Sequence, residues 1–432
     1  MFKIKDILCS KVDEIRDFII NTGQEIFKNP ELGFKEFNTL NLIKEIFDSL
    51  GLSYESEISV TGIKCKIGSG NGPNIGLIAE LDGVPTLGHK YSGEDLGVAH
   101  SCGHSNQVAI MLGVIKSLVE CNFFDKYDGS VTFIGTPAEE FTDLEYRSKL
   151  VEKNEIKYMS GKQDMIYKGV FDDVDLALSC HTMGSKAEPS ADVNSSLNGF
   201  IHKIVKYHGK AAHAGACPHL GVNALNAAVI GLTAVNAQRE TFIDDHNIRV
   251  HGIIKNGGHT VNTVPEEVEI EAYVRGNDIV SLLDANSRVN RAFEAGAYAV
   301  GGTIDIIDTN GYVPFKQDQK LSQLVKGNLS AFVKKDNLYD GVKSMASGDI
   351  GDLSVFLPTI QFGFSGFVGS VHGSDFDISD NDMAYIVPTK VILMTIVDLL
   401  GDNACKSNEI IDGFVPVMSR EKYFEKWLKA ND

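Results

Sequence analysis

The sequence predicts an α/β fold in which a domain with a mainly parallel sheet and helices on both faces carries an inserted ferredoxin-like α+β domain. Three apolar runs, at 75–82, 131–140 and 174–181, end in acidic residues or a histidine, as buried parallel strands with functional C-terminal ends do. A later run, 199–307, has the order strand, helix, strand, strand, helix, strand. The length of 432 residues exceeds what one core usually organises, so we expect two domains.

The predicted first domain begins with two helices and then alternates strands with helices. Apolar residues recur at helical spacing over 6–22 and 36–51, with a turn at 29–33 between them. A glycine-rich segment at 68–73 lacks the spacing of a phosphate-binding loop, so we interpret it as a turn between strands. The other elements are expected as strands at 60–67, 75–81, 131–134 and 176–179 and as a helix at 103–119.

The predicted second domain lies inside the first. A strand at 359–364 and a final helix at 386–400 follow it, so the chain is expected to return to the first domain. We therefore predict a discontinuous domain of residues 1–195 and 312–432 and an inserted domain of residues 196–311. The inserted domain is expected to contain strands at 199–207, 249–254, 268–274 and 303–307 and helices at 223–238 and 279–297.

Charge and cysteine content indicate where the protein works. The chain has 40 basic and 58 acidic residues, a net charge of −18, which disfavours nucleic acid and anionic membranes as partners. Its seven cysteines are scattered, without a C-x-x-C pair, as in reduced proteins. The N-terminus has no signal-peptide core, and the apolar run 391–400 is too short for a membrane span. We expect a cytoplasmic protein.

A charged segment, 143–173, interrupts the first domain between two of its predicted strands. One interpretation is a solvated surface excursion, because charged side chains of both signs recur along it. The alternative is a lid over a functional site, because such insertions often carry function on a rigid scaffold. The sequence leaves both interpretations open.

Several side chains with metal-binding chemistry follow the predicted strands. A buried cysteine or a lone histidine is usually structural, and a Cys–His protease pair would need its base from elsewhere in the fold. Two adjacent glutamates after a strand, however, are costly to bury without a cation. Together the strand ends predict a metal site that includes Asp82, Cys102, His104, Glu139, Glu140, His181 and, from a distant loop, His372.

These motifs resemble those of a known enzyme family. The runs 77–85, 99–104 and 136–140 look like successive motifs of the two-metal amidohydrolases of the aminoacylase and carboxypeptidase-G-like metallopeptidase family. The Cys-Gly-His form at 102–104 is similar to the branch of indole-acetyl-amino-acid, hippurate and p-aminobenzoyl-glutamate hydrolases. The resemblance covers nearly the whole chain, continuing through 209–214, 218–224, 257–258, 262–265, 274–275, 347–352 and 372.

The resemblance implies roles for individual residues. Two divalent ions, zinc or manganese, would be bound by Cys102, His104, Glu140, His181 and His372. Cys102 stands where the wider family has a bridging aspartate. Glu139 would be the general base, and Asp82 would orient His104.

The inserted domain would contribute further residues. In this family it dimerises and lends a histidine, here His213, to the active site of the partner subunit. Asn262 and Arg275 would hold the free carboxylate of the substrate, a group that suits the bidentate geometry of arginine. The resemblance therefore implies a homodimer that acts on small amides with a free carboxylate.

The expected activity is hydrolysis of the amide bond of an N-acyl or N-aroyl amino acid, hippurate-like or aminobenzoyl-glutamate-like, to a free amino acid and an acid. A dipeptidase on the same scaffold and a non-catalytic metal-dependent binding protein remain alternatives. Three features depart from the family pattern: Ser105 replaces an Asp or Asn, Glu80 replaces a ligating histidine, and the insertion at 143–173 is long. These departures bear on the choice of substrate.

Overall fold

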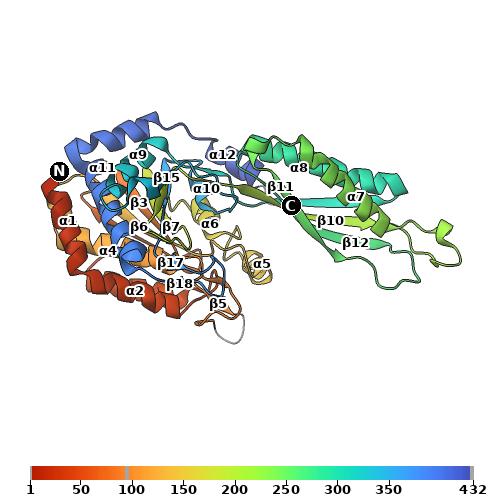
Figure 1. Ribbon diagram of the computed structural model, residues 1–432, viewed down its shortest axis with the longest axis horizontal. Coiled ribbons are helices and arrows are strands. Elements are labelled where there is room, and N and C mark those ends of the chain that lie inside the picture. Colours follow the sequence, from red (N-terminus) through yellow and green to blue (C-terminus); the bar gives the residue numbers. More distant parts are fainter. Residues whose placement is uncertain (1, 93–96, 429–432) are drawn as a thin grey trace. The chain divides into compact units, whose positions relative to one another are not determined.

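The structure is a computed structural model that describes residues 2–92 and 97–428 (Figure 1). The chain forms two compact units. The first comprises Met1–Ser195, Lys316–Lys343 and Asp352–Val417. The second comprises Ser196–Phe315, Ser344–Gly351 and the C-terminal residues from Met418.

This division differs from the predicted boundaries in three short segments, 312–315, 344–351 and the C-terminal residues from Met418. Hydrogen bonds tie the last two to the second unit. The backbone carbonyl of Ala346 accepts a hydrogen bond from the Asn198 N–H over 2.8 Å. The indole N–H of Trp427 donates to the carbonyl of Gly311 over 3.1 Å. These hydrogen bonds join residues far apart in the sequence, so no local sequence pattern predicts them.

The first unit contains an eight-stranded mixed sheet in the order β1-β2-β6-β3-β7-β16-β8-β15. Its central pairs β6–β3, β3–β7 and β7–β16 are parallel. Every residue of β3 and β6 is buried, so the middle of the sheet is covered on both faces. The strands are β1 (Glu55–Ile58), β2 (Gly62–Gly68), β3 (Asn74–Glu80), β6 (Ser130–Thr136), β7 (Leu176–Thr182), β8 (Ala191–Val193), β15 (Leu338–Asp340) and β16 (Thr359–Phe364).

Helices enclose this sheet. The predicted helix at 6–22 is in fact two, because the backbone leaves the helical conformation at Ile15. Helices from the two ends of the chain, α1 (Phe2–Glu14) and α11 (Val387–Gly413), pack side by side (Figure 1). Central α4 (His104–Glu120) is apolar nearly all round because it lies in the core. The other helices of the first unit are α2 (Arg16–Lys28), α3 (Phe37–Ser49), α5 (Leu144–Glu152), α6 (Gly161–Tyr167) and α9 (Gln319–Leu329). A short helix, α10 (Ile350–Leu353), begins in the second unit and ends in the first.

One helical segment, Asp382–Gly413, is long and apolar enough to cross a membrane, although the sequence analysis expected no such segment. The expectation stopped at 400, whereas the helical conformation continues beyond it after an interruption at Gly401–Ala404. In the most apolar part of this segment 83% of the residues are buried inside the protein. Its surroundings are therefore those of a core helix.

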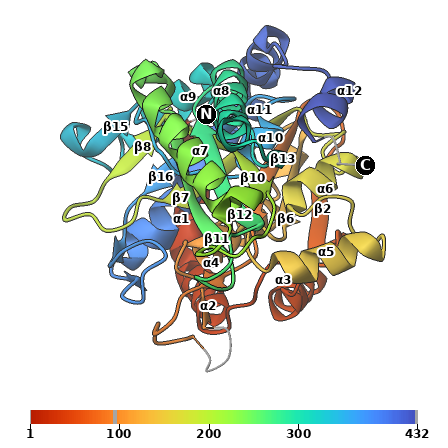
Figure 2. The same ribbon diagram turned by 90° about the vertical axis from the view of Figure 1, so that its right-hand side faces the viewer.

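The second unit is a four-stranded antiparallel sheet, in the order β11-β12-β10-β13, with two helices packed against it. Burial alternates along β12, so one face of the sheet is covered. Figure 2 shows the two helices side by side over β10 and β12. The chain order β-α-β-β-α-β is that of a ferredoxin-like sandwich. Its elements are β10 (Gly199–His208), α7 (Ala224–Gln238), β11 (Arg249–Asn256), β12 (Glu267–Gly276), α8 (Ile279–Val300) and β13 (Thr303–Asn310).

Short elements complete the description. Two pairs of two-residue strands stand near the sheet ends of the first unit, and a short helix precedes the C-terminus. They are β4 (Val84–Pro85) with β5 (Val98–Ala99), β17 (Phe367–Val368) with β18 (Asp377–Ile378), and α12 (Arg420–Lys422); β9 (Ser196–Leu197) and β14 (Phe315–Lys316) flank the ferredoxin-like part of the chain.

Candidate metal centre

The predicted metal ligands come from the C-terminal ends of parallel strands and the loops beside them, all in the first unit. His181 lies near the end of β7, and Glu139 and Glu140 follow β6. His104 is the first residue of α4, and Cys102 stands two residues earlier. Parallel strands deliver their C-terminal ends to one edge of the sheet, which is the usual ligand-binding edge of such folds. His372 reaches this edge from the loop between β17 and β18.

The turn into α4 needs the glycine between Cys102 and His104. Gly103 has a φ of +80°, in the left-handed region that favours glycine. A Cβ atom there would also lie only 3.1 Å from the Thr182 side chain, which follows His181. Gly103 therefore lets the cysteine and the histidine face the end of β7 from one tight turn.

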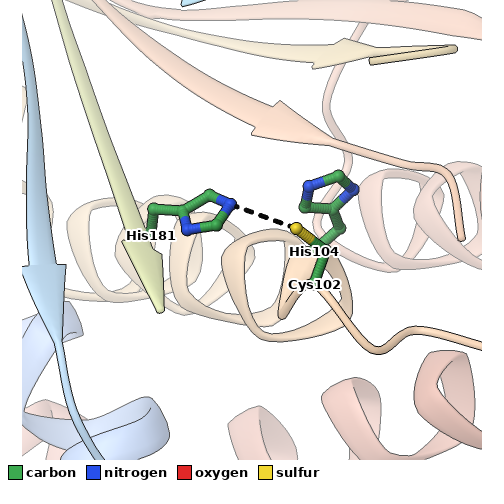
Figure 3. A group of neighbouring side chains, drawn as sticks. All are labelled: Cys102, His104 and His181. Atoms are coloured by element: carbon green, nitrogen blue, oxygen red, sulfur yellow. Dashed lines mark hydrogen bonds between the residues drawn. The ribbon is translucent and has the colours of Figure 1, made fainter. Parts of the chain in front are cut away.

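Two of the candidate ligand groups share one sulfur, that of Cys102. In the first group, Cys102, His104 and His181 offer atoms that all lie within 4.8 Å of one another (Figure 3). In the second, Cys102, Glu140 and His372 do the same. The Cys102 Sγ atom is 3.5 Å from His181 Nε2 and 3.2 Å from His372 Nε2. Atoms bound to one ion at roughly 2.0–2.3 Å have separations of about this size.

Two histidines already present a nitrogen to these groups. His104 Nδ1 hydrogen-bonds the carbonyl of Asp82 over 2.9 Å and lies 3.4 Å from its carboxylate. His181 Nδ1 hydrogen-bonds the carbonyl of Thr182 over 3.0 Å. Each Nδ1 therefore donates its proton to a backbone carbonyl, which turns Nε2 toward the other ligand atoms. Within the described residues the buried Nε2 of His104 makes no hydrogen bond, which fits a ligand atom.

Burial and neighbouring charges shift the pKa values of two of the candidate ligands. Burial, and then the Glu140 carboxylate, raise the pKa of the Cys102 thiol well above its usual value. Burial acts to raise the pKa of Glu140, but the hydrogen bond and charge of His372, together with His104 and Cys102, lower it overall. A thiol ligates as a thiolate, so a divalent ion must displace its proton on binding. The donor set of one sulfur, three imidazoles and one carboxylate suits such ions.

The loop that carries Glu139 and Glu140 is held from several sides. Asp82 accepts the backbone N–H groups of both glutamates, over 3.1 and 3.0 Å. The N–H of the preceding Ala138 donates to the buried carboxyl of Glu36 over 2.8 Å. Ala138 itself has a φ of +54°, an unfavourable conformation for a residue with a Cβ. Asp82 thus orients His104 and the glutamate loop together.

The segment 143–173 contributes two buried cations to this region. Arg147 of α5 and Lys162 of α6 each have 0% of their surface exposed. The Arg147 guanidinium donates to the carbonyls of Ala138, Glu140 and Met159. Most of α6 is buried, so this part of the segment belongs to the core and is not a surface excursion. Glu36, Arg147 and Lys162 could not be predicted as part of the site, because they lie in no motif whose spacing distinguishes them from surface charges.

The remaining predicted residues lie in the second unit. His213 is exposed, and its Nδ1 accepts hydrogen bonds from the N–H groups of Gly215 and Ala216 over 3.2 and 3.0 Å. Its proton therefore resides on Nε2, the nitrogen that can donate to an oxyanion. Asn262 lies beside it, with its amide nitrogen 3.5 Å from Nε2.

Arg275 is the third predicted residue in the second unit. It lies on β12, half-buried, with its guanidinium 5.6 Å from the ring centre of Tyr273 and 5.9 Å from that of Phe200. One of its nitrogens donates to the Ser347 hydroxyl over 3.3 Å. Arg275 is therefore a partly desolvated cation held against aromatic rings, which differs from an ordinary surface arginine.

The sequence comparisons place this site in a known family. The family model for peptidase family M20/M25/M40 matches residues 76–390. The chain belongs to this family. IAA-amino acid hydrolase ILR1-like 4 of Arabidopsis thaliana is 22% identical over 426 residues, covering 94% of this chain and 92% of that protein. The Xaa-Arg dipeptidase of Mus musculus is 27% identical over 379 residues, covering 83% and 79%.

Solved structures share the fold of this M20 protein at low identity. A putative aminohydrolase of methicillin-resistant Staphylococcus aureus has a TM-score of 0.78 at 22% identity, covering 92% of this chain and 100% of that one. A dinuclear metal binding peptidase of the M20 family from Bacillus subtilis has a TM-score of 0.69 at 17%, covering 90% and 99%. The aminobenzoyl-glutamate utilization protein of Klebsiella pneumoniae has a TM-score of 0.63 at 16% identity, covering 91% of this chain and 99% of that one.

These findings confirm the family and the α/β fold that the sequence predicted. They also confirm the enzyme class: the protein is a metal-dependent amidohydrolase or peptidase of the M20 family.

Proposed function

We propose that this M20 protein is a two-metal hydrolase that cleaves the amide bond of an N-acyl or N-aroyl amino acid carrying a free carboxylate. The observation that supports it most is the Cys102 sulfur, which two of the candidate ligand groups share. The Glu139 carboxylate lies 3.8 Å from His104 Nε2. This is the arrangement of a dinuclear centre with a carboxylate beside it. Zinc suits the thiolate and imidazoles, and manganese would accept the carboxylate.

The proposed roles follow from the chemistry of the side chains. Two divalent ions, when bound, would supply the Lewis acidity that polarises the scissile carbonyl and acidifies the attacking water. Glu139 takes the proton of that water and passes it to the leaving nitrogen. The Nε2–H of His213 donates to the oxyanion, and Asn262 and Arg275 hold the substrate carboxylate.

The Glu139→Gln variant tests this proposal, because it keeps the shape of the side chain but removes the base. We expect it to fold, to hold the same metal content as the wild type and to lose about 10²- to 10⁴-fold in kcat. Glu145→Gln, at an exposed position of α5, is the control and should be unaffected. The measurement is hydrolysis of hippurate-like and aminobenzoyl-glutamate-like amides. Full activity of metal-loaded Glu139→Gln would contradict the assignment.

A dipeptidase is the second candidate, favoured by the similarity to an Xaa-Arg dipeptidase. Assaying dipeptides beside acyl-amino acids separates the two, by which class has the higher kcat/KM. A binding protein without catalysis would hydrolyse neither class. Less than one equivalent of metal per chain after purification with metal would argue against the two-metal hydrolase.

We further propose a cytoplasmic homodimer that pairs through the second unit. Strand β11 is at the edge of the four-stranded sheet and exposes most of its residues, including Ile253 at 64%. Helix α7 exposes Val229 and Ile230. Exposed apolar edge strands attract a second strand, so a partner copy is the natural cover. Seven free thiols and a net charge of −18 support the cytoplasm and argue against nucleic-acid or membrane partners.

A further inference from the structure

The carboxylate of Glu80 lies beside the metal centre with both oxygens already bound. Glu80 is the last residue of β3, and its side chain is 2% exposed. One oxygen accepts a hydrogen bond from the Lys162 ammonium over 2.6 Å, and the other accepts from the Gln107 amide over 2.7 Å. That second oxygen is also 3.2 Å from His104 Nε2, closer than the 3.8 Å of Glu139. By distance alone, Glu80 could reach an ion bound to His104.

Lys162 is fixed in place by its helix. The preceding Gly161 packs so tightly that a Cβ there would lie 1.8 Å from the carbonyl oxygen of Pro137, in the turn that leads to Glu139. Two residues further on, the buried Asp164 accepts hydrogen bonds from the Ser59 hydroxyl over 2.6 Å and from the Lys157 N–H over 2.6 Å. The ammonium is therefore held next to Glu80 by packing on both sides.

The metal centre holds more acids than its ligand set requires. Besides Glu140, the carboxyls of Glu80, Asp82 and Glu139 are all buried within the same edge of the sheet. A buried carboxylate without a cation is strongly unfavourable, and the charge of a metal is absent until one binds. Lys162 supplies one permanent positive charge among these acids.

We propose that Lys162 is a positioning residue and internal counter-ion: it keeps Glu80 out of the coordination of the ion beside His104 and stabilises the acidic metal centre before metal binds. The proposal rests on the two-metal site proposed above. It adds a role for the segment 143–173, which the sequence left as a surface excursion or a lid.

Lys162→Met is the test, because methionine fills the space but cannot pair with Glu80. In chelator-treated protein we expect Tm to fall by about 5 °C or more, since Glu80 loses its counter-ion. With zinc bound the fall should be smaller, because the ion compensates the freed carboxylate. Zinc affinity, measured by competition with a chromophoric chelator, should rise by about tenfold or more, because a positive charge is removed from near the ion. A loss of packing alone would lower both Tm values equally.

The double variant Glu80→Gln with Lys162→Met removes both charges. It should recover most of the Tm lost in the chelator-treated single variant and return zinc affinity to within about threefold of the wild type. Lys149→Met, at an exposed position of α5, controls for the loss of a lysine. Any of three results would overturn the inference. They are an equal fall of Tm with and without zinc, a zinc affinity that is unchanged or weaker, and a double variant that does not recover the lost Tm. Wild-type protein that binds less than one zinc would instead contradict the proposed function.

Discussion

Cys102 is the residue on which both candidate metal positions depend. Its sulfur lies within reach of His104 and His181 on one side and of Glu140 and His372 on the other. The buried thiol has a raised pKa, so in the metal-free protein it stays protonated, and metal binding must release that proton. Loss of this single side chain should therefore affect two ions.

We predict that Cys102→Ala binds little metal, because each group loses a ligand, whereas Cys102→Asp retains part of the metal because a carboxylate can also bridge two ions. The measurement is elemental analysis per chain after purification with zinc or manganese. Cys405→Ser, at an exposed thiol, serves as the control. If Cys102→Ala keeps both ions, the shared-sulfur arrangement is wrong.

Glu36 shows how a buried acid outside the ligand set supports the site. Its carboxyl accepts hydrogen bonds from the Ala138 N–H and the Thr61 hydroxyl. Burial, and then the charge of Asp82, raise the pKa of Glu36 to about 8. The folded protein therefore keeps a proton on Glu36 at pH values where the unfolded chain has lost it.

This raised pKa gives a pH dependence of stability with a definite sign. Between pH 4.5 and about 8 the folded state binds more protons than the unfolded state at Glu36, so its contribution is present at acid pH and is lost as pH rises. Glu36→Gln removes this dependence. We predict that chelator-treated wild type loses stability relative to chelator-treated Glu36→Gln as the pH rises. The difference in Tm, wild type minus variant, should decrease by several degrees from pH 5 to pH 9, as measured by calorimetry. A constant difference would contradict the raised pKa.

At the scale of elements, the loop after β6 takes its conformation from helix α5. Arg147 donates to the backbone carbonyls of Ala138 and Glu140, on both sides of Glu139. Its guanidinium lies over the Phe34 ring, 5.4 Å from the ring centre. The unfavourable φ of Ala138 persists because Glu36, Asp82 and Arg147 bind the backbone around it. The helix thus fixes the position of Glu139, the proposed general base.

We predict that Arg147→Met lowers kcat by about 10- to 100-fold with a smaller change in KM, because Glu139 moves while the groups that bind substrate do not. It should also lower the free energy of unfolding by about 2–4 kcal/mol, since buried carbonyls lose their donor. Steady-state kinetics and denaturant unfolding measure both effects. Lys149→Met on the same helix should change neither, and an equal response of the two variants would exclude a specific role for Arg147.

In the whole molecule, a dimer would decide whether His213 acts in the site of its own chain or in that of the partner subunit. This histidine and the ligands belong to different units of the chain. The family resemblance implies that His213 serves the site of the partner subunit. Separate defects in Glu139 and His213 can then be repaired by mixing chains, because a mixed dimer has one site with neither defect.

We predict that unfolding and refolding an equal mixture of Glu139→Gln and His213→Ala chains restores about a quarter of wild-type activity, since half of the dimers are mixed and each has one intact site. Each variant alone should stay inactive. Ile253→Asp on the edge strand β11 should abolish the recovery and give a monomer by light scattering. No recovery in the mixture would place His213 in the site of its own chain or outside catalysis.

The amino-acid sequence was enough to predict the family, the α/β architecture and the side chains with metal-binding chemistry. Those signals are local, because they consist of apolar runs and the acids or histidines that end them. It placed Glu80, Glu139 and Glu140 at strand ends but could not assign their contacts. Only the tertiary structure showed that Lys162, 82 residues away in sequence, binds Glu80, and that Arg147 holds the glutamate loop. Those contacts depend on how α5 and α6 pack near the ends of β3 and β6, and no spacing of residues along the chain predicts that packing.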